Sequence, residues 1–138
     1  VVVYLQIQHA KDRPVGFDRE GIIHLPIRTD DLRKTDYNSL RNELLSSGAV
    51  NNMAVSDHPV TGSMSADASL NWEGKDPNQS VNFPNNAVTY EFGKVLGWQI
   101  KEGRDFSRDF ATDSAAFILN ESAVKFIGLK DPVGKIIQ

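Results

Sequence analysis

The apolar residues of this chain come in short runs, each ended within a few positions by glycine, proline or a cluster of polar residues. None of these runs approaches the roughly eighteen consecutive apolar residues that a membrane-spanning helix needs. Runs of this kind suit the strands and helices of one small domain, or of two lobes that share a core, and 138 residues suffice for either. We therefore expect an α+β fold with small mixed sheets and about three short helices.

Composition excludes several function classes without naming one. Apolar residues make up 40% of the chain and charged residues 24%, which is typical of a globular domain and disfavours disordered, collagen-like and coiled-coil structures. The net charge is −3 and neither sign forms a long block, which argues against a general polyanion binder. Because cysteine is absent, the chain has no disulfide, no thiolate zinc ligand and no cysteine nucleophile. The same absence does not indicate whether the protein works in an oxidising or a reducing compartment.

Two interpretations of the first residues compete. Residues 5–8 alternate between apolar and polar, as a half-buried strand does. Alternatively, residues 1–5 are the last turn of a membrane helix, with Tyr4 at headgroup depth and the basic Lys11 and Arg13 just beyond it. A complete signal peptide is not expected, because neither a basic segment nor a small-residue cleavage site flanks the apolar run.

The first half of the chain predicts a strand, a helix and a second strand. Ile22–Ile27 is a short apolar segment in which Pro26 indicates a sheet edge or a strand end. Asp36 is a good N-cap for a helix whose apolar residues recur at helical spacing until Gly48 ends it. Residues 50–55 are then expected to form the second strand.

The second half predicts short elements around a long polar segment. Residues 56–86 suggest a hairpin excursion or a loop, with short strands near residues 70–72 and 81–83. One helix is expected over residues 90–96, ended by Gly97, and another is expected between a cap at Asn120 and a stop at Gly128. The remaining strands are predicted at three apolar segments, residues 98–100, 115–119 and 135–137.

No motif assembles a catalytic or metal site by itself. The three histidines are too far apart in sequence for the usual motifs that bring two imidazoles to one metal ion. Ser56-Asp57-His58 has the residue types of a hydrolytic triad, but neighbours on an extended chain point to opposite faces and cannot converge. Asp105, Asp109 and Asp113 interleave with arginines and are expected in a solvated turn with local ion pairs.

Two further motifs have simple explanations. The segment from Gly128 to Ile136 resembles a phosphate loop, but its glycine spacing is too long and Ile136 stands where a magnesium-binding hydroxyl is required. Asn78-Gln79-Ser80 and Asn120-Glu121-Ser122 match the glycosylation sequon, and the second is better explained as a helix cap. We expect neither a nucleotide site nor another cofactor in this chain.

The two tryptophans are expected in different environments. Trp98 lies in an apolar segment and is predicted to be in the core. Trp72 lies among polar residues and is the candidate exposed anchor for a partner, since aromatic residues dominate contact energetics; a half-buried Trp72 is the alternative. Asp57 and His58 belong to the same polar excursion, so these two residues and Trp72 form the candidate partner surface.

The order of three segments resembles a known family. They are Gly103-Arg104-Asp105-Phe106, then Phe117-Ile118-Leu119-Asn120-Glu121-Ser122-Ala123-Val124, then Asp131-Pro132-Val133-Gly134-Lys135-Ile136. A G-R-x-F turn, a strand running into N-E-x-A and a D-P-x-G-K turn follow one another with comparable gaps in the extracytoplasmic core domain of MacB/FtsX-like ABC transporter permeases. The chain is similar to that domain over nearly its whole length, and residues 53–86 match least.

The resemblance implies a domain organisation and a location. The family domain lies between the first and second membrane helices, on the periplasmic side of the inner membrane. Residues 1–21 would be a membrane-helix stub and entry segment, and residues 22–138 the core domain. Residues 22–55 would form a porter-like lobe and residues 56–138 mainly a second, more strand-rich lobe. The family domain usually continues past the D-P-x-G-K turn, so part of the porter-like lobe would be missing here.

The same resemblance implies a function without catalysis in this chain. An ABC ATPase subunit or domain would hydrolyse ATP in the cytoplasm, while this domain moves with the membrane helices and contacts an adaptor or cargo. The permeases act as pairs, whereas the isolated domain could be monomeric. The alternatives are a secreted hydrolase that gathers His58 with a distant carboxylate and hydroxyl, and an extracytoplasmic ligand-binding module lined by exposed aromatic residues.

Overall fold

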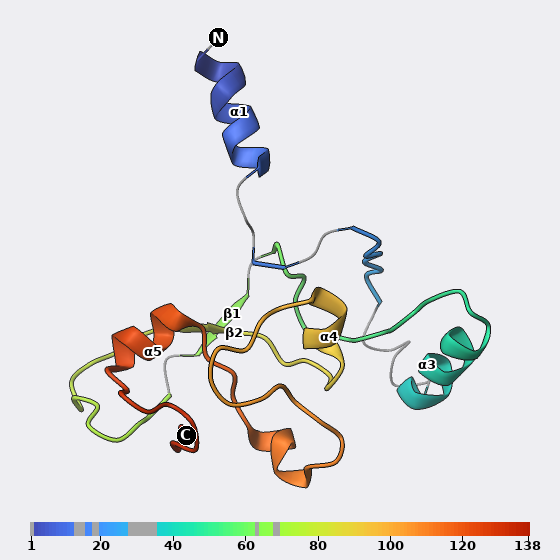
Figure 1. Ribbon diagram of the computed structural model, residues 1–138. Coiled ribbons are helices and arrows are strands. Elements are labelled where there is room, and N and C mark those ends of the chain that lie inside the picture. Colours follow the sequence, from blue (N-terminus) through green and yellow to red (C-terminus); the bar gives the residue numbers. More distant parts are fainter. Residues whose placement is uncertain (1, 13–15, 18–19, 28–35, 63, 68–69) are drawn as a thin grey trace.

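The computed structural model describes residues 2–12, 16–17, 20–27, 36–62, 64–67 and 70–138. Within these residues the chain has an α+β fold, as expected, with four α-helices, one 3₁₀ helix and one two-stranded sheet (Figure 1). The helices are short and most of the remaining chain runs in loops between them. Loop contacts therefore contribute much of what holds the described part together.

The first helix, α1 (Val2–Asp12), stands away from the other elements (Figure 1). Its apolar side chains, including Tyr4 and Leu5, are largely exposed. The strand interpretation of residues 5–8 is therefore wrong, because these residues are helical and have no neighbouring strand in the described chain. Among the described residues, no helix is both long enough and apolar enough to cross a membrane.

Helix α3 (Tyr37–Ser46) begins where its capping residue was predicted. The carboxylate of Asp36 accepts hydrogen bonds from the backbone N–H groups of Asn38, at 3.2 Å, and Ser39, at 3.3 Å. These bonds satisfy two of the backbone donors that a helix leaves unpaired at its start. The helix lies at one end of the molecule and none of its residues is fully buried (Figure 1).

The sheet consists of β1 (Ser65–Asp67) and β2 (Phe83–Asn85), which pair in antiparallel register with Ala66 opposite Pro84. The predicted strand near residues 81–83 is thus found two residues further along. The predicted strand near residues 70–72 is reduced to an isolated bridge between Trp72 and Ile137. This bridge joins the polar excursion to the last residues of the described chain.

Several predicted strands are absent from the described part of the chain. Residues 22–27, 50–55, 98–100 and 115–119 are not strands, and the exposed fractions of Ile23 and Phe117 are 82% and 52%. Neither residues 22–27 nor residues 117–119 make a backbone hydrogen bond to another described segment. A strand needs such a partner, and an apolar pattern alone does not supply one. Of the strand-helix-strand unit predicted for residues 22–55, only the helix is observed.

The core is small and aromatic. Helix α4 (Phe92–Leu96) buries Phe92 and Leu96, and the Phe92 ring meets the ring of the half-buried Trp98 edge-on at 5.6 Å. Gly93 allows this approach, because a Cβ atom there would lie 2.0 Å from Trp98 Nε1. Gly97 ends the helix in the left-handed region at φ 65°, as predicted.

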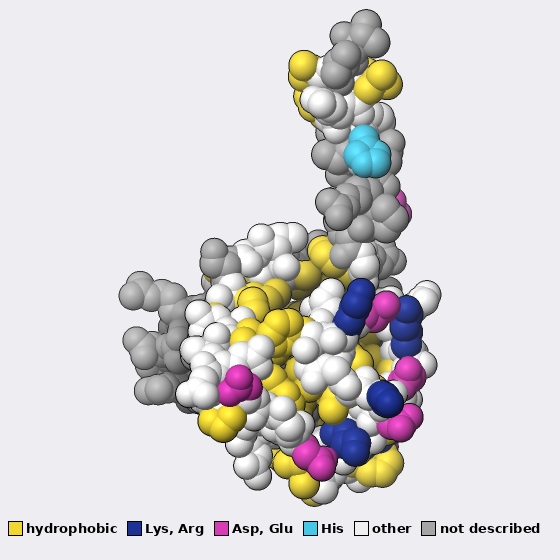
Figure 2. Space-filling model, turned by 90° about the vertical axis from the view of Figure 1, so that its left-hand side faces the viewer, with side chains coloured by type: hydrophobic (Ala, Val, Ile, Leu, Met, Phe, Trp, Pro, Cys, Tyr) yellow, Lys and Arg dark blue, Asp and Glu magenta, His cyan; other side chains and the backbone are white. Residues whose placement is uncertain are grey.

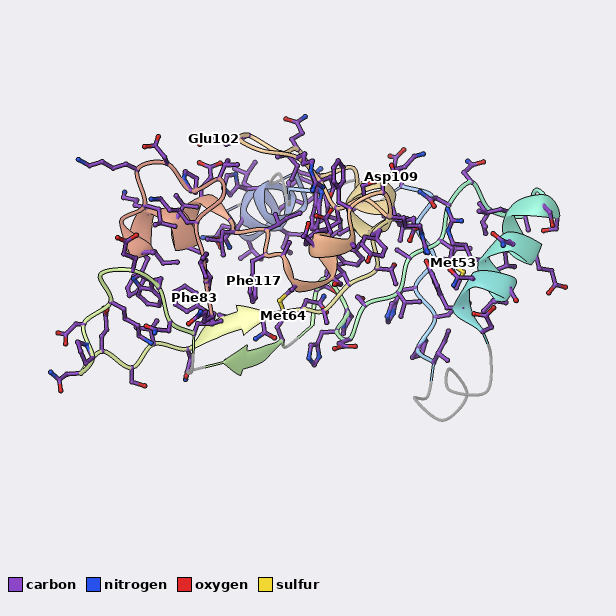
Figure 3. The ribbon with its side chains drawn as sticks, turned by 90° about the horizontal axis from the view of Figure 1, so that it is seen from below. Met53, Met64, Phe83, Glu102, Asp109 and Phe117 are labelled. Carbon is purple, nitrogen blue, oxygen red and sulfur yellow. The ribbon has the colours of Figure 1, made fainter. Side chains whose placement is uncertain are left out.

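A second aromatic group joins β2 to α5 (Glu121–Ile127). The Phe83 ring contacts the Trp72 ring at 5.7 Å and the Phe126 ring at 5.8 Å, both edge-on. Figure 3 shows Phe83 on the side of β2 that faces α5. The predicted cap of α5 is confirmed, since Asn120 Oδ1 accepts the backbone N–H of Ala123 at 2.8 Å.

Trp72 is therefore a core residue and not the exposed anchor that its polar neighbours suggested. Only 8% of Trp72 is exposed. The indole packs on Phe83, and the Lys75 ammonium lies 4.9 Å from the ring centre. Local polarity was a poor guide because the contacts of Trp72 come from segments up to sixty-five positions away, at Ile137.

Replacing Trp72 with alanine is expected to lower the free energy of unfolding by about 3 kcal/mol, since it removes a buried aromatic side chain without refilling the space. Urea unfolding followed by circular dichroism measures this change. Phe117→Ala is the matched control, because Phe117 is 52% exposed, and its loss should be well under half as large. Equal losses in the two variants would contradict the burial of Trp72.

Candidate functional site

Six side chains from three distant segments meet beside α3 and α4. Five of them gather around the carboxylate of the sixth, Glu91, and we call the group the Glu91 cluster: Tyr37, Asn38, Arg41, Thr89, Glu91 and Arg108. Helix α3 contributes the first three, the turn that leads into α4 contributes Thr89 and Glu91, and the loop after Trp98 contributes Arg108. The cluster thus connects α3 to the rest of the described chain.

The Tyr37 hydroxyl lies within hydrogen-bonding distance of three acceptors. Its oxygen is 3.2 Å from the Met53 carbonyl oxygen, 3.4 Å from Thr89 Oγ1 and 3.1 Å from Glu91 Oε2. Figure 3 shows Met53 close to α3. Thr89 Oγ1 also accepts the backbone N–H of Val55 at 3.0 Å. One phenol therefore links α3 to both the chain that leaves it and the turn before α4.

Glu91 is shared by two arginines. Arg108 Nε donates to Glu91 Oε1 at 2.6 Å, and an Arg108 terminal nitrogen donates to Asn38 Oδ1 at 3.1 Å. Arg41 Nε lies 3.7 Å from the same Glu91 oxygen, which is ion-pair distance but too long for a hydrogen bond. The Glu91 side chain is only 11% exposed, so these cations provide much of the compensation that water would otherwise give.

The electrostatics of the cluster favour its charged form. Burial raises the pKa of Glu91, but hydrogen bonds from Arg108, from its own backbone and from Tyr37 outweigh burial and hold this pKa below its ordinary value. The hydrogen bond to Glu91 raises the pKa of Arg108. Burial raises the pKa of the Tyr37 hydroxyl, which keeps it protonated as a donor.

A second ion pair organises the loop that carries Arg108. The Arg104 guanidinium binds the two Asp113 carboxylate oxygens at 2.6 and 2.7 Å, and the Ser107 N–H donates to Asp113 at 2.9 Å. Arg104 also lies over the Phe110 ring, 3.9 Å from its centre. Asp113 is the buried residue of the 3₁₀ helix η1 (Ala111–Ala115), so the expected solvated turn is wrong for this residue, although its ion pair is local as predicted.

The other two acidic residues of that series have separate roles. Asp105 Oδ2 accepts the Trp98 indole N–H at 3.0 Å and Asp105 Oδ1 accepts the Phe106 N–H at 2.8 Å. Asp109 is exposed and accepts the Ser107 hydroxyl at 3.0 Å. Within the part of the chain that the structure describes, no three acidic or histidine side chains are grouped so that they could hold a metal ion.

The residues of the predicted partner surface lie in unlike environments. Asp57 is exposed, His58 is half-buried and Trp72 is buried. The Ser56 hydroxyl donates to the His58 carbonyl oxygen at 2.9 Å, and the Asn86 side chain bonds both the N–H and the carbonyl of His58 at 3.0 Å. Ser56-Asp57-His58 is therefore a turn tied to Asn86, with its serine hydroxyl bonded to its own backbone.

Two open grooves mark the described surface. One, of about 400 Å³, adjoins the Glu91 cluster and is lined by Tyr90, Glu91, Lys94, Asp105, Phe106, Ser107, Arg108 and Asp109. The other, of about 470 Å³, lies beside Trp72 and the segment 134–138. Figure 2 shows acidic and basic side chains interspersed along one side of the molecule, with hydrophobic side chains uncovered beside them. The charges around the first groove are likewise of both signs.

Comparison with protein-family models, with curated proteins and with solved structures finds no match to this chain. The interpretation of its function therefore depends on its own residues. Sequence patterns did not reveal the Glu91 cluster, because Tyr37, Glu91 and Arg108 are separated by up to seventy-one positions and none stands in a recognised motif. The only local signal was the helix that carries Tyr37.

The Asp113 ion pair predicts acid sensitivity. The Arg104 guanidinium and the Ser107 N–H lower the pKa of Asp113 from 3.8 to about 2. A carboxyl with a lowered folded-state pKa contributes stability that is complete above pH 3.8 and is lost as the pH falls towards about 2. Asp113→Asn should therefore be less stable than wild type at neutral pH, and the difference should shrink across this window.

Urea unfolding midpoints at neutral pH, at the upper end of this window and at its lower end measure the effect. Asp109→Asn is the control, because Asp109 is exposed, and it should follow the wild-type curve closely. A stability difference between wild type and Asp113→Asn that is constant over the whole pH range would contradict the proposed pairing.

Proposed function

We propose that this chain is the extracytoplasmic core domain of a MacB/FtsX-like ABC transporter permease, which transmits movement and makes no covalent chemistry of its own. The proposal depends on the structural role of the three family-like segments. Their residues build turns, a helix cap and an ion pair, and contacts between the segments hold them together. A domain that transmits movement requires contacts of this kind between its segments.

The three segments form one connected unit. Gly103 adopts φ 83°, and a Cβ atom added there would lie 3.4 Å from Val133 Cγ2, so the G-R-x-F turn lies beside the D-P-x-G-K turn. Lys101, just before the first turn, pairs with Glu121 of the N-E-x-A segment at 2.7 Å. A resemblance spread over three sequence segments thus corresponds to one cluster in space, which supports reading the segments together.

Each segment also depends locally on the residue types that define it. Arg104 holds Asp113 with two hydrogen bonds, and Asn120 caps α5. In the last segment the Lys135 N–H bonds back to the Pro132 carbonyl at 3.3 Å, and Gly134 has φ 80°. A side chain other than glycine is strained at such a φ. These requirements explain why these residues stand where they do without invoking catalysis.

Two exposed features fit a domain that is attached to other parts of a transporter. The apolar side chains of α1 are uncovered, as expected for the end of a first membrane helix. Ile23, Leu25 and Phe117 are exposed, and their segments have no strand partner among the described residues. In this proposal, strands elsewhere in the permease pair with these segments.

The proposed role needs an ATPase and a pair of permease subunits. ATP hydrolysis in the cytoplasm would change the membrane helices, and the domain would transmit that change to an adaptor or cargo on the periplasmic side. Such coupling requires elements with discrete arrangements that both ends of the system can bias. Ion pairs between segments, such as those of the largely buried Glu91 carboxylate, are suited to this because the hydrogen bonds of a network strengthen one another.

The location is tested by cysteine labelling, for which a chain without cysteines is a clean background. Ser122, on the exposed side of α5, is replaced by cysteine in the complete protein, with any cysteines elsewhere in that protein replaced by serine. Ser122→Cys should react with a membrane-impermeant maleimide in intact cells whose outer membrane has been made permeable. The buried Leu96→Cys is the control and should react only after denaturation.

Labelling of Ser122→Cys only after the inner membrane is broken would place the domain in the cytoplasm and refute the proposal. The same preparation gives a second readout, because the complete protein should copurify with an ABC ATPase in mild detergent. Absence of any ATPase from a membrane-inserted preparation would also count against it.

A further inference from the structure

The polar excursion contains an Asp-Pro peptide bond that is exposed and held in a turn. Asp76 and Pro77 are both exposed, and the Gln79 N–H donates to the Asp76 carbonyl oxygen at 2.9 Å. The Asn78 N–H donates to Asp76 Oδ1, also at 2.9 Å. An Asp-Pro bond hydrolyses more readily than other peptide bonds, because the carboxylate can reach the carbonyl carbon of its own residue and the proline nitrogen, a tertiary amide, is readily protonated as it leaves.

We propose that the bond between Asp76 and Pro77 is a self-cleavage site, at which the folded chain cuts itself in mild acid. Asp76 Oδ2 forms a bond to the Asp76 carbonyl carbon, and the bond from that carbon to the Pro77 nitrogen breaks. The nitrogen takes a proton from the acidic solvent and becomes a new N-terminus. Asp76 is left as a five-membered cyclic anhydride, which one water molecule opens to give a C-terminal aspartate with two carboxyl groups.

The turn holds the reacting groups of Asp76 in place. The Gln79 N–H points at the carbonyl oxygen, which becomes an oxyanion when the carbon is attacked, and a donor that is already in place stabilises such an oxyanion. The Asn78 N–H holds Oδ1, so the carboxylate stays beside the chain that follows Asp76. Asp76 Oδ2 accepts no hydrogen bond from the described residues and is free to attack.

A second Asp-Pro bond in the same chain lacks these contacts. Asp131 is also exposed, but its carbonyl and carboxylate oxygens accept no hydrogen bond within the described ranges. The turn there forms one residue later, where the Lys135 N–H donates to the Pro132 carbonyl oxygen at 3.3 Å. The two bonds therefore have the same chemistry and differ in their local structure, so the second serves as an internal reference.

Contacts on both sides of the cut would hold the two fragments together. Trp72 belongs to the first fragment, and its ring meets Phe83 of the second fragment at 5.7 Å. Trp72 also forms the bridge to Ile137, and β1 of the first fragment pairs with β2 of the second. Cleavage thus opens one exposed turn and leaves these contacts formed. Neither the cleavage nor the association of the fragments depends on the proposed function.

Mass spectrometry of the chain during incubation at about pH 4, near the ordinary pKa of an aspartic acid, tests the cleavage. At this pH the Asp113 ion pair still contributes its full stability. Cleavage after Asp76 should be about tenfold faster than cleavage after Asp131, because only the former has the carbonyl donor. In urea at the same pH the two rates should become about equal. The cut chain, returned to neutral pH, should elute as one species in size-exclusion chromatography.

Two substitutions at one position separate the backbone donor from its side chain. Gln79→Pro removes the N–H and should slow this cleavage to the rate found after Asp131, whereas Gln79→Ala keeps the N–H and should cleave as the wild type does. Circular dichroism at the same pH shows that each variant is folded. Equal rates at the two Asp-Pro bonds of the folded chain, a rate difference that persists in urea, or equal cleavage of the two folded variants would overturn the proposed site. Fragments that separate at neutral pH would refute their association.

Discussion

The carboxylate of Glu91 is largely buried, and the side chains that compensate its charge come from parts of the chain that are distant in sequence. Only 11% of the Glu91 side chain is exposed, and its oxygens are held by Arg108 and Tyr37, with Arg41 close by. Removing a partner from a buried charge costs more than an exposed ion pair contributes, because the remaining charge has lost both water and its counterion. The position of α3 relative to α4 therefore depends largely on Glu91 and on the hydrogen bonds of Tyr37, since α3 itself buries no residue completely.

The remainder of the described chain is organised by equally specific contacts in place of a large core. The Arg104–Asp113 pair shapes one loop, the Trp72–Phe83–Phe126 rings join the sheet to α5, and Gly93 admits the Trp98 indole against α4. Contacts of this kind have few intermediate arrangements, because a bidentate ion pair or an interlocked ring is either formed or broken. A module held in this way suits the transmission of discrete movements, which is the role we propose.

Sequence reasoning succeeded where the physical cause was local. Asp36 and Asn120 cap their helices, and Gly97 and Gly128 end theirs, because each depends only on residues three or four positions away. It failed where the cause was a distant partner. Ala115 to Leu119 has the composition of a buried strand but pairs with no strand in the described part of the chain, and Trp72 is buried by residues that its neighbours do not predict. The Glu91 cluster, assembled from α3, a turn and a loop, lay beyond any pattern in a single segment.

We propose that α3 moves relative to the motif-bearing part of the domain when the proposed transporter uses ATP. Spin labels on Asn42→Cys in α3 and Ser122→Cys in α5 of the complete, reconstituted transporter report this distance by pulsed electron paramagnetic resonance. We expect two distance populations whose proportions change between the nucleotide-free and ATP-trapped states. A single distance, unchanged by nucleotide in a transporter that hydrolyses ATP, would contradict it.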